Sequence, residues 1–416
     1  MNPICIFKDL IELYPTWPEL ERYLESEEGG LFRISDRSED GRCLIRYEKD
    51  ITNMNLPHSK WFRSVVWDIN LHRPISISPP KAVEDCPYVM DPDLESAGVV
   101  CQELLDGFMI NGYKRVGDET FYISSRSKLD ATGTFYSDKS FRHLFIEAYT
   151  GWIVASDDSL EWLIQEESKN IPSPHEENQE IAVGYSFVVQ HKEHRIVKEI
   201  TQNAAFFIHK SIVYQDGTVL IQDHMTELDI PYHIIQQPPV LQPQGNISEW
   251  IKEELENRLW DVQGIVLRDQ RGNRWRYRSE KYNAVRSLRG NTPRVMDRFV
   301  QLYLQNVVPI YLTYYPADSM TFTIYTEFIH QVVKMLYEHY VELRIRRSTT
   351  LTLIDRMYHP HLYAIHGIYQ TKLRPQPVTI DTIYDYLRTL PWQRVSFLLR
   401  NYMDSYFSMI NHIIQT

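Results

Sequence analysis

The chain has 416 residues, 43% of them hydrophobic and 24% charged, which excludes wholesale disorder and provides enough apolar surface for a packed core. Its 44 Lys and Arg and 55 Asp and Glu give a net charge of −11. This charge argues against a basic coat on nucleic acid but leaves room for a local basic groove. No apolar run has the ~18 residues of a membrane span, and the start lacks the pattern of a secretory signal. Together with four scattered cysteines, this predicts an intracellular protein that does not engage a membrane.

The first part of the chain alternates between helical and strand patterns. An apolar helical face over residues 7–14 ends at a proline pair, and a second short helix over 19–25 ends at Gly29-Gly30. Alternating apolar and polar residues then predict strands, and a cluster of prolines predicts a turn. The strands are expected at 31–34, 43–47 and 64–69, and the turn at 74–80.

The middle of the chain continues this pattern around one acidic segment. Residues 156–180 hold eight acidic side chains against one lysine, so we expect a solvated helix end and loop there. A helix is predicted at 141–153, strands at 108–111, 120–124, 185–189, 195–199, 206–208, 211–214 and 218–222, and a linker at 236–244.

A helix and a hairpin precede a change of character near residue 290. Ser248 can cap a helix over 249–260, and strands at 264–268 and 273–278 flank a turn at 269–272. Beyond residue 290 apolar residues recur at helical spacing. The sequence therefore predicts two domains, 1–290 and 291–416, the second all-helical.

Four segments, taken in order, are more informative than any one alone. They are Glu103 to Phe108, Phe187 to Val197, Val262 to Leu267 and Arg274 to Tyr282. This order and spacing resembles the covalent nucleotidyltransferases, in particular the phage-type ATP-dependent RNA ligases that repair cut tRNA. In that family the segments read Lys-x-Asp-Gly, Phe-Glu followed by Asn-Arg-Ile-Val, Glu-Gly, and Lys-x-Lys followed by Tyr. Arg63-Ser64 and Pro79-Pro80-Lys81 also lie where the family has Arg-Gly and a Pro-x-x-Lys-Phe turn.

The resemblance implies an α+β fold, with an antiparallel-sheet nucleotidyltransferase (RNA-ligase-like) core followed by an all-helical C-terminal domain. It also implies a chemistry. A lysine amine attacks the α-phosphate of ATP, carboxylates bind the ribose and a divalent cation, and paired lysines hold the phosphate oxygens.

This sequence departs from the family at the positions that carry that chemistry. Leu104 stands in place of the nucleophilic lysine, and Val188 and Gln263 stand in place of two glutamates. Leucine has no lone pair, so this site cannot form the phosphoramidate. Arg276 and Arg278 keep the charge of Lys-x-Lys. Asp106, Gly107, Arg195, Gly264 and Tyr282 match the family pattern.

These losses predict a catalytically inactive protein retained for binding, with no catalytic residue and no cofactor. One alternative is an active RNA ligase that uses a displaced lysine, Lys81 or Lys114, together with ATP and Mg²⁺. The other alternative is a structural component of a virion or complex. Ligase-like genes are frequent in phages and large DNA viruses, so the resemblance is compatible with a viral source.

The binding hypothesis is supported by a basic segment. Residues 264–298 hold ten basic and three acidic side chains, with aromatic residues between them. Such a pattern suits RNA or DNA, an acidic protein partner, or simply a solvated hairpin. The candidate binding residues are Arg63, Arg126, Arg195, Arg274, Arg276, Arg278, Lys281 and Tyr282.

No metal site is expected from the sequence. His359, His361 and His366 are interpreted as surface histidines, because Pro360 disrupts helical spacing and no cysteine lies near them. His191 and His194 are interpreted as loop histidines.

Overall fold

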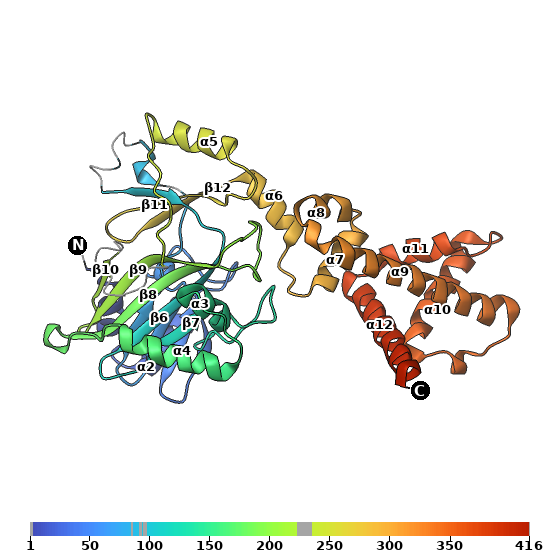
Figure 1. The fold of residues 1–416 in the computed structure, drawn as a ribbon, viewed down its shortest axis with the longest axis horizontal. Coiled ribbons are helices and arrows are strands. Elements are labelled where there is room, and N and C mark those ends of the chain that lie inside the picture. The colour runs from blue at the N-terminus through green and yellow to red at the C-terminus, as the bar shows by residue number, and fades with distance from the viewer. Residues whose placement is uncertain (1–2, 85, 91–93, 95–97, 223–234, 416) are drawn as a thin grey trace. The chain divides into compact units, whose positions relative to one another are not determined.

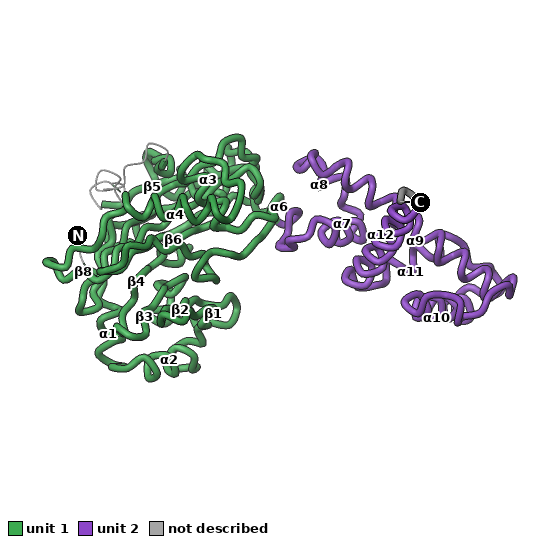
Figure 2. Tube along the Cα trace, turned by 60° about the horizontal axis from the view of Figure 1, so that its bottom comes forward, with its two compact units in different colours: residues 1–286 green, residues 287–416 purple. Residues whose placement is uncertain are grey.

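The computed structural model describes residues 3–84, 86–90, 94, 98–222 and 235–415. The chain divides into two compact units, Met1–Arg286 and Ser287–Thr416, which Figure 2 colours separately. None of the helices in the described ranges is both long and apolar enough to cross a membrane.

Unit 1 begins with two helices that pack beside a four-stranded antiparallel sheet, as Figure 2 shows. Their apolar faces, including Phe7 and Leu20, are fully buried against strand residues such as Trp67. The predicted helices and strands of this region are confirmed. The elements are α1 (Ile6–Leu13), α2 (Trp17–Glu25), β1 (Arg33–Arg37), β2 (Arg42–Arg46), β3 (Val65–Asp68) and β4 (Arg73–Ile77), with the strands in that spatial order.

The proline-rich turn predicted at 74–80 is wrong at its start, because β4 is a strand. Within its sheet β4 pairs only with β3, so Pro74 lies on an edge strand where a missing N–H is tolerated. A bulge between Val66 and Trp67 accommodates this pairing.

A five-stranded antiparallel sheet forms the centre of unit 1. One face packs on the four-stranded sheet through residues such as Tyr113 and Val213, and the other packs on two helices through Phe145 and Phe187. Figure 1 shows these helices lying across the sheet. The elements are β6 (Phe108–Arg115), β7 (Tyr122–Ser125), β8 (Glu180–Gln190), β9 (Ala204–Tyr214), β10 (Val219–Gln222), α3 (Phe141–Thr150) and α4 (Asp157–Asn170), with strand order β10-β9-β8-β6-β7.

Two predictions in this region need correction. The acidic segment holds α4, a 14-residue helix that buries Leu160, Leu163 and Ile164, so only part of it is solvated loop. The strand predicted at 195–199 does not form. The carboxylate of Asp106 accepts hydrogen bonds from two of its backbone N–H groups, which therefore need no neighbouring strand.

A three-stranded antiparallel sheet completes unit 1, in the order β12-β11-β5. Figure 1 shows a helix lying over it, and Ile247 and Ile251 of that helix pack on Trp275. On the outer edge of β12, Val83 forms a parallel bridge, since its N–H donates to Arg274 O and its carbonyl accepts from Arg276 N–H. The elements are β5 (Val100–Glu103), α5 (Ile247–Asn257), β11 (Gly264–Arg268) and β12 (Arg274–Arg278).

The predicted cap of the helix before this hairpin is corrected. The side chain of Asn246, rather than Ser248, accepts a hydrogen bond from the N–H of Glu249 at 3.1 Å, and the helix starts at Ile247. Asn246 was overlooked because Ser, Asn and Asp are near-equal caps, so position decides between them.

Every regular element described in unit 2 is helical, and its core is rich in aromatic rings packed on one another, among them Phe299, Tyr311 and Phe322. The surface interpretation of His361 is wrong, because this side chain is buried with Nδ1 2.7 Å from the Tyr386 hydroxyl. The helices are α6 (Glu280–Arg289), which crosses the division between the units, α7 (Val295–Leu304), α8 (Val308–Tyr314), α9 (Ser319–Tyr340), α10 (His359–Ile368), α11 (Ile380–Thr389) and α12 (Trp392–Gln415). The predicted α+β class is confirmed.

Candidate functional site

One pocket of unit 1, with a volume of about 330 Å³, is lined by residues from all four sequence segments. Strand pairing brings them together. Glu103 of β5 pairs with Ile265 of β11, so that Leu104 N–H donates to Gly264 O at 2.9 Å. Met109 of β6 pairs with Val188 of β8. The positions predicted as degenerate motif residues that line the pocket are Leu104, Asp106, Gly107, Val188 and Gln263.

Asp106 fastens three of these segments to one another. Its Oδ2 accepts from the backbone N–H groups of Val197 (3.0 Å) and Lys198 (2.8 Å), and its Oδ1 accepts from the Tyr282 hydroxyl (2.8 Å). Burial and the neighbouring Asp106 raise the pKa of Tyr282, which keeps its hydroxyl a donor. A Cβ at Gly107 would lie 2.4 Å from Val189 O, so the adjoining glycine is required by close backbone approach. Both residues therefore shape the pocket.

Cationic side chains dominate the pocket wall. Among the residues that the structure describes, eight cationic side chains and two carboxylates line it, in a chain whose net charge is −11. Exposure rises from Arg268, which is buried, through the half-buried Arg63 and Arg274 to Arg126 and Arg278, which are exposed. The eight are Arg63, Lys81, Arg126, Arg268, Arg274, Arg276, Arg278 and Arg286.

The two carboxylates already have partners. Asp106 accepts the three hydrogen bonds given above, and Glu103 Oε2 lies 3.7 Å from Arg258. Among the described residues, the buried Nε atoms of Arg274 and Arg276 have no hydrogen-bond partner. The exposed carboxylate of Glu84 lies 4.0 Å from Arg276. The pocket therefore holds more cationic charge than its own carboxylates balance.

Burial and crowding lower the pKa values of two of these cations. Burial, together with the charges of Arg126, Arg276 and Arg278, lowers the pKa of Arg63 to about 10. Burial, together with Arg63, Arg268 and Arg276, lowers the pKa of Arg274 to about 9. Both guanidinium groups remain charged at neutral pH but at a cost that an anion in the pocket would reduce.

Two predicted binding residues lie elsewhere. Arg195 does not line the pocket, and its Nε donates to Val197 O at 3.1 Å. Lys281 Nζ donates to Glu256 O at 2.7 Å and Arg258 O at 3.3 Å, at the end of α5. Both cations therefore stabilise backbone carbonyls. The other predicted binding residues, Arg63, Arg126, Arg274, Arg276, Arg278 and Tyr282, line the pocket.

Of the two lysines considered as substitute nucleophiles, only one lines the pocket. Lys114 Nζ is buried and donates to Ser168 O (3.2 Å) and Ile171 O (3.3 Å) near the end of α4, so it is no part of the pocket. Lys81 lines the pocket, with Nζ 5.3 Å from the ring centre of Tyr47. Tyr47 also lies 4.5 Å from the Arg126 guanidinium. The sequence analysis missed Tyr47, because nothing in the local pattern separates it from other strand-end tyrosines.

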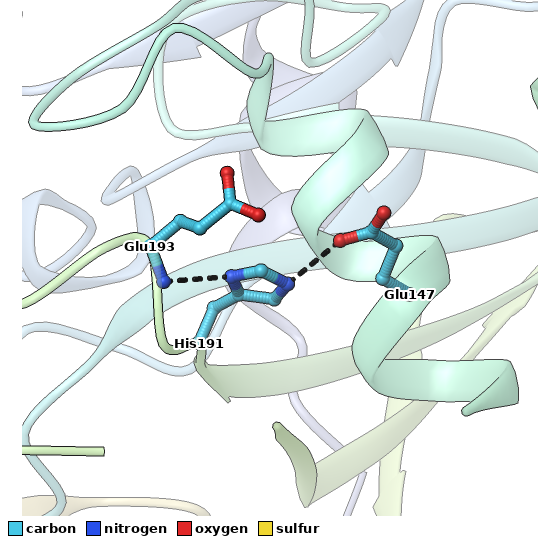
Figure 3. A group of neighbouring side chains, drawn as sticks. All are labelled: Glu147, His191 and Glu193. Carbon is cyan, nitrogen blue, oxygen red and sulfur yellow. Dashed lines mark hydrogen bonds and ion pairs between the residues drawn. The ribbon is translucent and has the colours of Figure 1, made fainter. Parts of the chain in front are cut away.

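A second cluster, Glu147, His191 and Glu193, brings together side chains of metal-ligating types. Figure 3 shows the His191 ring between the backbone of Glu193 and the carboxylate of Glu147 on α3. Nε2 lies 2.9 Å from Glu147 Oε2, and Nδ1 accepts the N–H of Glu193 at 3.1 Å. Lys139 Nζ lies 3.1 Å from Glu147 and 2.7 Å from Glu193. An ammonium group thus already bridges the two carboxylates, and we assign this cluster as an ion-pair network.

The contacts and burial in this network also shift the pKa values of Glu147 and His191. Burial alone would raise the pKa of Glu147, but the N–H of Val154, the Lys139 ammonium and His191 hold it below its ordinary value. Burial lowers the pKa of His191. Besides Glu147, the Nε2 atom of His191 also contacts the amide nitrogen of Asn203, at 2.8 Å.

Comparison with known proteins finds ligases among solved structures, at low similarity. No protein-family model matches the sequence, and neither does any curated protein. An archaeal ATP-dependent RNA ligase is 9% identical over 71% of this chain and 68% of its own, with a TM-score of 0.37. A lysine-to-alanine mutant of an RNA ligase from Naegleria gruberi is 13% identical over 49% and 56%, with a TM-score of 0.30. A protein of Aquifex aeolicus assigned as an ATP-dependent DNA ligase is 13% identical over 85% and 80%, with a TM-score of 0.36.

Proposed function

We propose that this chain is a catalytically inactive nucleotidyltransferase-like protein that binds phosphates of RNA or DNA in the arginine-lined pocket. One observation carries the proposal. Leu104, Val188 and Gln263, the residues in place of a nucleophile and two metal-binding carboxylates, line the same pocket as the eight cationic side chains. The pocket thus combines the means to bind phosphate with the absence of a nucleophile at the family position.

The motif residues that this chain keeps support the proposal. Asp106, Gly107 and Tyr282 hold the segments together through hydrogen bonds and close packing. A chain that keeps these residues but lacks the lysine and the two glutamates retains the shape of the pocket without the group-transfer chemistry. All four cysteines are free thiols, which fits an intracellular protein.

A second candidate is the displaced-lysine enzyme, favoured by the position of Lys81 in the pocket. One experiment separates it from the first. Purified protein is incubated with radiolabelled ATP or GTP and Mg²⁺ or Mn²⁺, then run on a denaturing gel. We expect no labelled protein band. A band that Lys81→Arg abolishes would establish the enzyme instead.

Binding is tested on the same preparation with single-stranded RNA and DNA across a salt series. Arg276→Ala should weaken binding about tenfold and lower the salt slope by about one. The matched control is Arg271→Ala, which removes the same charge from the exposed turn of the same hairpin, outside the pocket. Equal effects of the two variants would reject the pocket as the binding site. No affinity at any salt would reject nucleic-acid binding and favour an acidic protein partner, as in a virion or other assembly.

A further inference from the structure

We propose that the pocket takes an oligophosphate group, two or more linked phosphates, and that it does so without a divalent cation. This inference rests on the proposed function, because it concerns the same pocket. It adds the chemical group that the pocket recognises. Enzymes that handle nucleoside triphosphates generally take them with Mg²⁺ bridging the phosphates and protein carboxylates. The residues of this pocket instead favour binding without a divalent cation.

The first argument is that, among the described residues, the carboxylates that line the pocket already have partners. Three hydrogen-bond donors occupy the Asp106 carboxylate, and Arg258 lies beside Glu103. Gln263 offers at best a neutral carbonyl, and Val188 offers no ligand atom. Mg²⁺ needs oxygen ligands in near-octahedral geometry and is held by carboxylates, so this wall does not supply a site. A cation there would also be repelled by the neighbouring guanidinium groups.

The second argument is the geometry of β12. Arg274, Arg276 and Arg278 occupy alternate positions of one strand, so they project from one face at intervals of about 6.7 Å. Trp275 and Tyr277 project from the opposite face and pack near α5. All three line the pocket, so their long side chains can direct several guanidinium forks to one anionic group, and each fork donates two parallel hydrogen bonds to an oxyanion.

The third argument is the size and burial of the pocket. Its volume of about 330 Å³ lies at the lower end of the range for small-molecule sites, ~300–1,000 Å³. Arg268 is buried, and the buried Nε of Arg274 has no partner among the described residues. An internal stretch of duplex backbone cannot reach such groups, whereas a compact terminal group can. A ligand that neutralises several crowded cations at once gains more there than a single phosphate does.

The test is titration calorimetry of the full chain with inorganic tripolyphosphate as the probe. We expect binding in EDTA and an affinity about tenfold weaker in excess Mg²⁺, because Mg²⁺ neutralises the probe and gains no ligand from the wall. Orthophosphate should bind at least about tenfold more weakly than tripolyphosphate. Binding that requires Mg²⁺, or is strengthened by it, overturns the inference.

Variants sharpen the test and guard against misfolding. Gln263→Glu preserves side-chain shape and adds one carboxylate, so it should weaken metal-free binding and reduce the inhibition by Mg²⁺. Gln270→Glu is the control, since Gln270 is exposed on the turn of the same hairpin and does not line the pocket. If the two variants behave alike, the pocket is not the binding site and the inference fails.

Competition experiments show which molecule carries the oligophosphate group, and they distinguish failure of this inference from failure of the proposed function. ATP and an RNA with a 5′-triphosphate compete with tripolyphosphate if the natural ligand carries a nucleoside or a strand. RNA that binds through Arg276 while tripolyphosphate does not bind overturns the inference and leaves the proposed function standing. Tripolyphosphate that binds while no nucleic acid competes overturns the proposed function and leaves the inference standing.

Discussion

The Asp106 carboxylate has a structural role that its place in a catalytic-looking motif conceals. Because it accepts from Val197, Lys198 and Tyr282, we expect Asp106→Asn to lower the free energy of unfolding by about 1.5–3 kcal/mol. Tyr282→Phe removes one of the three bonds and should cost about 1 kcal/mol. Urea unfolding followed by circular dichroism measures both. An Asp106→Asn protein as stable as the parent would contradict this assignment.

His209 makes folding sensitive to acid. Its Nε2 lies 2.9 Å from Ile77 O, and burial, with the charges of Arg274, Arg268 and Arg63, lowers its pKa from 6.5 to about 3. In the unfolded chain His209 therefore binds a proton below pH 6.5, whereas in the folded chain it binds one only below about pH 3. The stability that neutral His209 contributes is present above pH 6.5 and is lost as the pH falls, by about 1.4 kcal/mol per pH unit.

This linkage is measured as the difference in unfolding free energy between pH 7.5 and pH 5.5. His209→Gln keeps a side-chain donor and removes the titration, so the difference should shrink by about 1 kcal/mol. His175→Gln, at an exposed position of unit 1, is the control and should leave it unchanged. A pH dependence that survives His209→Gln intact would mean that other groups carry it.

Among the elements, α5 offers a direct choice between two caps. Asn246 accepts from Glu249 N–H, so Asn246→Ala should destabilise unit 1 by about 1 kcal/mol. Ser248→Ala should have no measurable effect on the melting temperature, because the helix has already begun at Ile247. The reverse result would restore Ser248 as the cap.

The β11–β12 pair depends on the glycine at its start. Gly264 has φ +149°, and a Cβ there would lie 2.0 Å from Tyr277 O. Gly264→Ala should therefore separate the two strands, lower the free energy of unfolding by about 3 kcal/mol and abolish oligophosphate binding. Gly117 also has a positive φ (+78°), but a Cβ there would meet no atom within 4 Å, so Gly117→Ala should cost only about 1 kcal/mol and leave binding intact.

These elements also show what the sequence can and cannot reveal. Alternation and helical spacing predicted most strands and helices, because each presents one apolar face to a core. The failures have specific causes. Pro74 concealed β4, and the Asp106 carboxylate, nearly a hundred positions away, removed the need for a strand at 195–199. Long-range hydrogen bonds of this kind leave no mark on a local pattern.

The same limit applies to the pocket. The four-segment resemblance located Leu104, Val188 and Gln263, and basic clustering located the arginines of β12, all of which line it. The sequence pattern could not distinguish a cation that faces the pocket from one that binds backbone carbonyls, as Arg195 and Lys281 do. Tyr47 was missed because its role depends on Lys81 and Arg126, which are distant in sequence.

For the molecule as a whole, the two units should respond differently to ligand. Every residue that lines the pocket lies in unit 1, with Arg286 the last of them. Calorimetry should therefore show two unfolding transitions, of which tripolyphosphate raises only one, by about 2.7 kcal/mol of stability at a concentration of 100 Kd. Arg276→Ala should abolish that shift. A single transition that moves as a whole would mean that the units unfold together.

The bridge made by Val83 bears on how the molecule avoids self-association. An unpaired edge strand is a template on which a second chain can add, and β12 would be such an edge because its neighbour lies on one side only. Val83 occupies the outward main-chain groups of Arg274 and Arg276. The charged row on this strand therefore stays available to small anions, while the backbone beneath it is closed to strand addition and to the aggregation that would follow.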